Sequence, residues 1–103
     1  MLLAAGDAVK FVRGCTREQF DKDNMIQLAT IKAIEIVGEA ASRVSQSFRA
    51  QHTEIPWTAI AGMRHRLVHD YFNIDLDILW ETANKDLPAL IVALEPLVPP
   101  EES

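Results

Sequence analysis

The densest group of chemically active side chains lies in the run Met-Arg-His-Arg-Leu-Val-His-Asp-Tyr at residues 63–71. Arg64 presents a planar fork of N–H donors that matches a phosphate. An unperturbed imidazole has a pKa of about 6.5, so His69 can move a proton near neutral pH. Tyr71 adds a phenolic hydroxyl. Together these side chains suit phosphate-ester chemistry that needs no metal ion.

Metal binding is an alternative for this run, because His65 and His69 have the four-residue spacing of metal ligands on a helix, and Asp70 follows. A zinc site needs a third and usually a fourth ligand. The remaining candidates, His52 and Glu54, lie in a separate loop without motif spacing. We therefore expect no metal or other cofactor and interpret His65 as a solvated side chain.

The size and charge of the chain limit what it can bind. Its 103 residues, 49% of them hydrophobic, predict one domain over residues 1–97 followed by a flexible tail at residues 98–103. The net charge of −5 argues against broad nucleic-acid binding, which usually uses a basic surface. Any RNA contact must therefore be local, with His65 and Arg66 as candidates beside Arg64.

Cysteine content and hydropathy bear on location. The single cysteine, Cys15, cannot form an internal disulfide, as is usual in a reducing cytosol. No apolar run approaches the roughly 18–20 residues that cross a bilayer. The opening Met-Leu-Leu-Ala-Ala also lacks the cationic start of a secretion signal. These features predict a cytoplasmic protein with no membrane association.

The first part of the chain reads as helical, and no strand pattern is visible anywhere. The apolar spacing predicts a helix over residues 2–13 that stops at Gly14. Thr16 and Gln19 have the form of a capping box and open a brief turn through Phe20.

Three longer helices follow in the prediction. Asp23 caps a second helix over residues 24–49, in which Gly38 and its small neighbours permit a close helix crossing. Pro56 opens a third helix, and Asp75 caps a fourth. The apolar side of the second helix is Ile26, Ala29, Ala33, Ile36, Val37, Ala40 and Val44, and that of the third is Trp57, Ile60, Ala61, Met63, Leu67 and Val68.

The fourth helix carries apolar residues every three or four positions up to Leu94. Pro88 is expected to kink it near Asp86, and Pro96 to end it. The architecture predicted from these elements is all-α, a small bundle of four main helices.

A purely structural role is a second alternative for the cationic run. Cations are favoured near a helix C-terminus by the helix dipole, and a charged helix end is commonly solvated surface. The arginines would then balance nearby carboxylates, namely those of Asp70, Asp75 and Asp77.

The sequence resembles the HEPN-domain proteins of the HepT-like toxin group over nearly its whole length. The matching stretches are residues 24–42 with Ile-Val-Gly-Glu-Ala-Ala at 36–41, Ile-Pro-Trp at 55–57, Ile-Ala-Gly-Met-Arg at 60–64, Leu-Val-His-Asp-Tyr-Phe at 67–72, Ile-Asp at 74–75 and Asp-Leu-Pro at 86–88. Arg64, His69 and Tyr71 satisfy the group's Arg-x4-His-x-Tyr signature. Two departures are a shorter first helix and His65, where relatives often carry a small polar residue.

This resemblance implies a ribonuclease toxin of a type VII toxin–antitoxin pair, usually a homodimer, silenced by a small nucleotidyltransferase antitoxin. RNA supplies its own nucleophile, the 2′-hydroxyl, so a proton acceptor and donors to the phosphate suffice without a metal. His69 would transfer the proton and Arg64 would bind the phosphate, leaving a 2′,3′-cyclic phosphate. The hydroxyl of Tyr71 would accept AMP from the antitoxin.

Helix geometry constrains this site. On a straight helix Arg64 and Tyr71 fall about 20° apart, but Arg64 and His69 diverge by roughly 140°. Either the backbone bends near His69, or the long arginine wraps round, or a second chain completes the site.

Other functional classes remain open from the sequence alone. The chain could be a catalytically inactive nucleotide-binding adaptor that docks a nucleotidyltransferase, or an ordinary structural helical dimer. It could also be the nucleotide-handling subunit of a two-component transferase, with Arg64 binding the phosphates of ATP.

Overall fold

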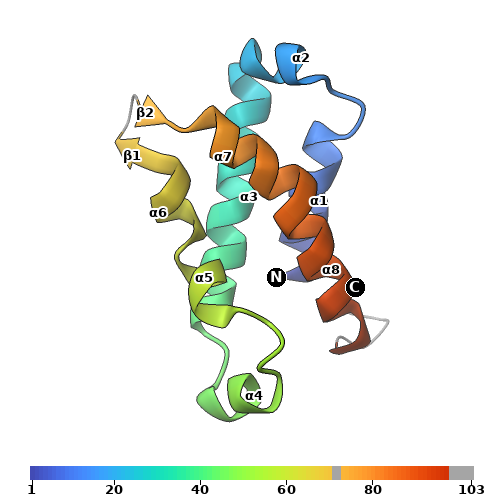
Figure 1. Cartoon of the computed structure of the whole chain (residues 1–103), viewed down its shortest axis with the longest axis vertical. Helices are drawn as coiled ribbons and strands as arrows, with labels where there is room; N and C mark the ends of the chain where they lie inside the picture. Colours follow the sequence, from blue (N-terminus) through green and yellow to red (C-terminus); the bar gives the residue numbers. More distant parts are fainter. Residues whose placement is uncertain (71–72, 98–103) are drawn as a thin grey trace.

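The computed structural model describes residues 1–70 and 73–97, which form an all-α bundle with one short hairpin (Figure 1). The long α3 lies in the middle. It packs against α1 on one side and against α5 and α6 on the other, while α7 and α8 complete the bundle. This arrangement confirms the predicted class, with α5–α6 and α7–α8 standing as the third and fourth main helices.

The first helix, α1 (Leu2–Val12), buries Ala4, Ala5 and Ala8 against α3 and α8. Small side chains let the helices approach closely. The helix ends before Gly14, as predicted, and Gly14 has a φ of 77°, which glycine adopts without a steric penalty.

The predicted capping box opens α2 (Arg17–Asp21). Thr16 Oγ1 accepts a hydrogen bond from Gln19 N at 3.1 Å, and Gln19 Oε1 accepts one from Thr16 N at 3.0 Å. Arg17 ties α2 to α7 by bonding both Asp21 and Asp77 at 2.7 Å. These bonds, first to Asp21 and then to Asp77, raise the pKa of Arg17 above its ordinary value.

The second main helix is shorter than predicted. Asp23 caps α3 (Asn24–Ser42) as expected, through a 3.0 Å bond from Ile26 N. The prediction of one helix over residues 24–49 is wrong, because α3 ends at Ser42 and Ser45 caps a separate α4 (Gln46–Gln51), accepting from Phe48 N at 3.2 Å. A serine oxygen that satisfies an unpaired amide can start a helix wherever the chain turns.

The buried side of α3 also differs from the predicted stripe. Ile36 is 45% exposed, whereas Ile31 and Ile34 are buried. Two polar side chains share the core-facing side: Thr30 donates to the Ile26 carbonyl at 2.7 Å, and Gln27 donates to backbone carbonyls of α2. These bonds meet the general requirement that buried polar groups be paired.

The predicted close crossing lies between α3 and α5 (Trp57–Ala61). A Cβ placed on Gly38 would lie 3.2 Å from the Ile60 carbonyl oxygen and 3.3 Å from that of Ala61. A side chain at this position would require α5 to move by a few tenths of an ångström. The close crossing at Gly38 fixes how near α5 lies to α3, and therefore also the position at which α6 begins.

The third helix is interrupted at Gly62, continues as α6 (Met63–Leu67) and then gives way to a hairpin of β1 (Val68–Asp70) and β2 (Asn73–Ile74). The prediction that the helix reaches Val68 and that no strand occurs is therefore wrong. The hairpin is closed at its base by a 2.7 Å bond from Asp75 N to the Leu67 carbonyl.

The last main helix consists of α7 (Leu76–Glu81), a π-helical turn η1 (Thr82–Asp86), α8 (Leu87–Leu94) and a 3-10 turn η2 (Glu95–Leu97). Asp75 caps it as predicted, accepting from Ile78 N at 3.0 Å. Where a kink was expected near Asp86, the structure has the π-helical turn, which ends just before Leu87 and Pro88. Pro88 has no N–H with which to continue the regular pattern.

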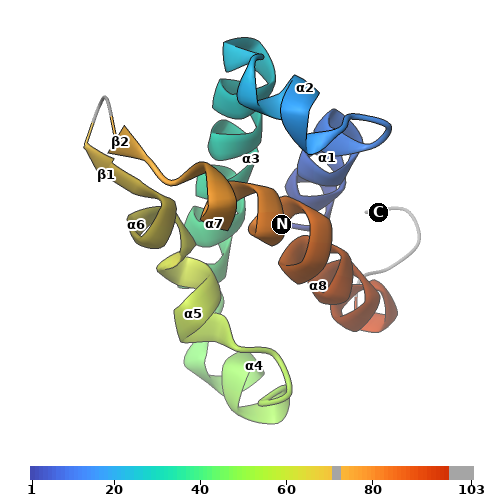
Figure 2. The ribbon, with the colours of Figure 1, turned by 45° about the horizontal axis from the view of Figure 1, so that its top comes forward.

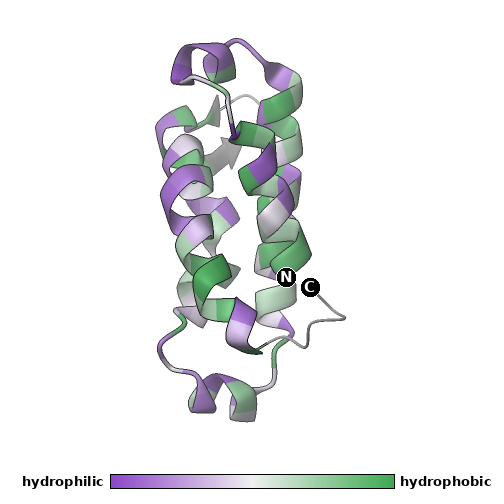
Figure 3. Cartoon of the chain, turned by 90° about the vertical axis from the view of Figure 1, so that its right-hand side faces the viewer, coloured by the Kyte–Doolittle hydropathy of each residue, from purple (hydrophilic) through white to green (hydrophobic). Residues whose placement is uncertain are grey.

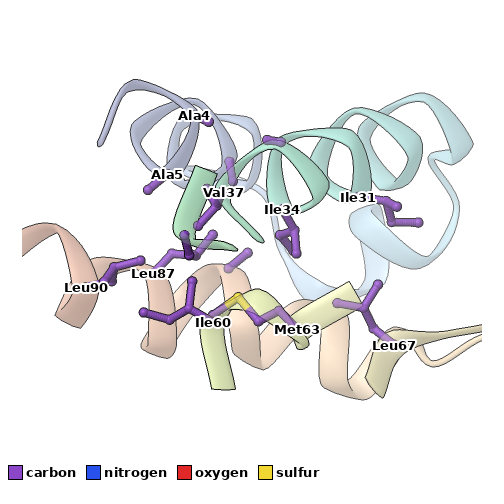
Figure 4. Close-up of a cluster of buried hydrophobic side chains, with 14 of the residues drawn as sticks. Ala4, Ala5, Ile31, Ile34, Val37, Ile60, Met63, Leu67, Leu87 and Leu90 are labelled. Carbon is purple, nitrogen blue, oxygen red and sulfur yellow. The ribbon is translucent and has the colours of Figure 1, made fainter. Parts of the chain in front are cut away.

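The core lies where α3 faces α5, α6 and α8. Figure 4 shows Ile31, Ile34 and Val37 of α3 opposite side chains of these helices, namely Ile60, Met63, Leu67, Leu87 and Leu90. Apolar residues line the inner sides of the helices, while α2 and α4 at the two ends are mostly polar (Figure 3). No helix in the described residues is both long and apolar enough to span a bilayer.

Candidate active site

The helix α6 holds three of the five side chains singled out from the sequence. Met63 and Leu67 are buried at its two ends and anchor it in the core. Arg64, His65 and Arg66 lie between them and are all exposed. At about 100° per residue, the three fan over roughly 200° of the outer helix surface.

Arg64 is held at the junction of α6 and α3 by an ion pair with Glu35, in which Arg64 Nε donates to Glu35 Oε1. Lys32 lies one turn away, with its Nζ 3.9 Å from the other carboxylate oxygen of Glu35. The Arg64 side chain is still 46% exposed. A guanidinium has five N–H donors, and among the described residues only Nε of Arg64 forms a hydrogen bond, so its terminal nitrogens can donate to a phosphate.

The carboxylate partner of Arg64 was not predicted from the sequence. Of the acidic residues proposed to balance the arginines, Asp77 pairs with Arg17 and Asp75 caps α7. Glu35 is 29 positions from Arg64, and only the packing of α6 on α3 brings the two together. No spacing rule within one helix identifies such a pair.

The hairpin changes the geometry of the candidate site. The helix ends at Leu67, so His69 lies in β1 and the separation of roughly 140° on a straight helix does not apply. Of the three arrangements considered, a backbone bend before His69 is present. Strand pairing joins Val68 to Ile74 and Asp70 to Asn73, with an irregular register between them at His69. Such bulges often redirect a side chain beside a functional site.

Two of the predicted functional groups fall beyond what the structure describes. Tyr71 lies outside the described residues, and so does the side chain of His69. Their positions relative to the Arg64 guanidinium therefore remain predictions.

Three of the residues considered as metal ligands lie on two separate elements of the described structure. His52 and Glu54 pair with each other on the loop before α5, with His52 Nδ1 3.5 Å from Glu54 Oε1, while His65 lies on α6. Within the described part of the chain, no three His, Cys, Asp or Glu side chains are grouped so that they could hold a metal ion.

These features define a small α-helical bundle with an exposed arginine near the start of the short helix α6, and a histidine in the strand that follows this helix. A family model described as "Ribonuclease HepT-like" matches residues 1–97. The chain therefore belongs to the HepT-like ribonuclease family.

Curated relatives agree with this assignment. The chain is 42% identical to a "Probable ribonuclease HepT" of Thermococcus cleftensis over 79% of this chain and 74% of that protein. It is 40% identical to a "Putative RNase" of Caldanaerobacter subterraneus subsp. tengcongensis over 80% of this chain and 73% of that protein. A "Putative RNase" of Methanocaldococcus jannaschii is 34% identical over 87% and 83% of the two chains. No solved structure matches the chain.

Proposed function

We propose that this protein is a metal-independent endoribonuclease, the toxin of a toxin–antitoxin pair that acts on cytoplasmic RNA. The observation that carries the proposal is the placement of Arg64. Its side chain is exposed on α6, and this helix leads directly into the irregularly paired strand β1, which contains His69. Membership of the HepT-like ribonuclease family and the ribonuclease names of the relatives support it.

The reaction needs only groups that the chain and RNA supply. His69 removes the proton of the 2′-hydroxyl, the 2′-oxygen attacks the adjacent phosphorus, and the bond to the 5′-oxygen breaks. The leaving oxygen takes up a proton, giving a 5′-hydroxyl and a 2′,3′-cyclic phosphate. Arg64 binds the phosphate and stabilises the charge that develops on it, and His65 and Arg66 contact the flanking RNA.

A symmetric homodimer is part of the proposal. The net charge of −5 disfavours RNA binding by one protomer, whereas two α6 ends in one cleft would double the local density of arginine and histidine. A monomeric solution mass together with full nuclease activity would contradict this arrangement.

The switch in the proposal is Tyr71, whose phenolic oxygen takes AMP from the ATP of a partner nucleotidyltransferase. The new bond joins that oxygen to the α-phosphorus, the bond between the α- and β-phosphates breaks, and pyrophosphate leaves. The added nucleotide brings bulk and negative charge to the motif, so it occupies Arg64 and repels substrate phosphate. The variant Tyr71→Phe should remain toxic in the presence of the transferase. If the transferase still neutralised that variant, this mechanism would be wrong.

Growth on induction of the chain alone tests the proposal in cells. Wild type should arrest growth, and either Arg64→Ala or His69→Ala should restore it. Arg43→Ala is the matched control, because Arg43 also forms an ion pair with a glutamate of α3 (Glu39, at 2.7 Å) but lies outside the motif. It should remain toxic. Toxicity that survives His69→Ala would refute the catalytic assignment.

A second candidate function is a non-catalytic adaptor that binds nucleotide or docks a nucleotidyltransferase. The ion pair between Arg64 and Glu35 favours this second candidate, because it gives Arg64 a structural role that requires no catalysis. In that case wild type would not cleave RNA, and Arg64→Ala would weaken nucleotide binding or complex formation instead.

A further inference from the structure

A groove of about 350 Å³ lies on the other side of α6 from the Arg64–Glu35 pair. Near the hairpin α6 contacts α7, and below this contact in Figure 2 the helices α5 and α8 diverge. The apolar lining of the groove includes Ile60 of α5, Met63 of α6, and Leu90 and Ala93 of α8. This volume is at the lower end of the range for small-molecule sites, so it suits one ring system rather than a large ligand.

Charged side chains of both signs complete the lining. Arg66 lies near the end of α6, Asp86 ends the π-helical turn, and Glu54 precedes α5. Within residues 1–67 and 74–97, neither Arg66 nor Asp86 forms an ion pair, although both line the groove. The Glu54 carboxylate, by contrast, lies 3.5 Å from His52. Arg66 and Asp86 therefore keep hydrogen-bonding capacity for a ligand.

We infer that this groove is a base-binding subsite for single-stranded RNA that prefers guanine, with Arg66 on the adjoining phosphate and Asp86 on the Watson–Crick edge of the base. The inference rests on the proposed ribonuclease function and adds substrate specificity to it.

The chemistry of the lining selects this ligand. Single-stranded RNA is commonly recognised by bases that leave the stack, lie against flat or apolar side chains and are read at their edges. A carboxylate only accepts hydrogen bonds, and it accepts best from two adjacent donors. Guanine is the RNA base whose Watson–Crick edge presents two adjacent N–H groups. Adenine, cytosine and uracil each place an acceptor beside their donor, which a carboxylate repels.

The order of exposed side chains on α6 gives the strand a path. Arg64 faces α3, Arg66 faces the groove, and His65 lies between them on the outer surface. A strand that crosses α6 can therefore place one phosphate at Arg64 and a neighbouring nucleotide at Arg66. The scissile bond and the base that is read would then lie on opposite sides of one helix.

Binding of blocked oligonucleotides tests the subsite separately from cleavage. The probes are 2′-O-methyl uridine tracts that contain one central guanosine, inosine or adenosine, and affinity is measured by fluorescence anisotropy. Their 2′-oxygen cannot attack, so none is cleaved. We expect the guanosine probe to bind wild type about tenfold more tightly than the inosine probe, which lacks one donor.

The variant Asp86→Asn should abolish this preference, because its side-chain amide places a donor beside an acceptor. Asp7→Asn is the matched control, since it removes the same charge from an exposed position of α1 and should keep the preference. Ala89→Phe fills the groove without changing the charge, and the guanosine, inosine and adenosine probes should then bind with similar affinity.

Equal binding of guanosine and inosine probes by wild type, or an unchanged preference in both Asp86→Asn and Ala89→Phe, would overturn the inference. A protein that shows the preference but never cleaves unmodified RNA would instead refute the proposed ribonuclease while leaving the subsite in place.

Discussion

Replacing Gly38 by alanine tests the contact that places the candidate site. The new methyl group would lie 3.2 Å and 3.3 Å from two backbone oxygens of α5, so α5 has to move by a few tenths of an ångström. Overpacking of this kind costs about 1–3 kcal/mol. Alanine returns about 1 kcal/mol through its higher helix propensity. We expect a net loss of about 1 kcal/mol.

Gly6 provides the matched control. It also lies inside a helix, but a Cβ there meets no atom within 4 Å. Gly6→Ala should therefore gain up to about 1 kcal/mol of stability, giving a change of opposite sign from the same substitution.

Thermal unfolding followed by circular dichroism measures both variants. For a domain of this size, 1 kcal/mol corresponds to about 4–8 °C in Tm. We expect Gly38→Ala to lower Tm and Gly6→Ala to raise it. If Gly38→Ala stabilised the protein as much as Gly6→Ala, the close crossing of α3 and α5 would be refuted as the constraint on α6.

The remaining predictions concern the surroundings of the motif. Glu35→Gln should leave the stability within about 1 kcal/mol of wild type but tighten RNA binding roughly fivefold in an anisotropy assay, because it removes a negative charge beside Arg64. Glu39→Gln removes a charge one turn further along α3 and should leave RNA affinity unchanged. If both variants changed RNA affinity equally, binding of phosphate by Arg64 would be contradicted. Asp75→Ala removes the cap of α7 and should cost about 1 kcal/mol in urea unfolding. Leu67→Ala empties a fully buried position and should cost about 2–5 kcal/mol in the same measurement.

The parts of the fold that follow from local chemistry were predicted from the sequence. The capping box at Thr16, the caps at Asp23 and Asp75 and the stop at Gly14 each depend on residues within three or four positions. The end of α3 was missed because the residues that follow favour helix about as well as those before. The cap at Ser45 depends on a turn that apolar spacing does not reveal.

The hairpin and the ion pair of Arg64 could not be predicted because both are tertiary features. Val68 continues the apolar spacing of the third helix, but its backbone pairs with Ile74 across the turn. Glu35 meets Arg64 only because α6 packs on α3. The motif itself was visible, since it is a local run of residues. The position of His69 relative to Arg64 depends on the bend after Leu67. The apolar periodicity instead favours a helix that continues past this residue.

Incubation of purified protein with single-stranded RNA in excess EDTA tests the central claim most directly, with the ends of the products identified by mass spectrometry. The account predicts cleavage that leaves 2′,3′-cyclic phosphates and 5′-hydroxyls, reduced at least a hundredfold in His69→Ala and in Arg64→Ala, a loss on the scale of a general base or a charge-stabilising donor. Absence of cleavage by wild type, or cleavage that is unchanged in both variants, would contradict it.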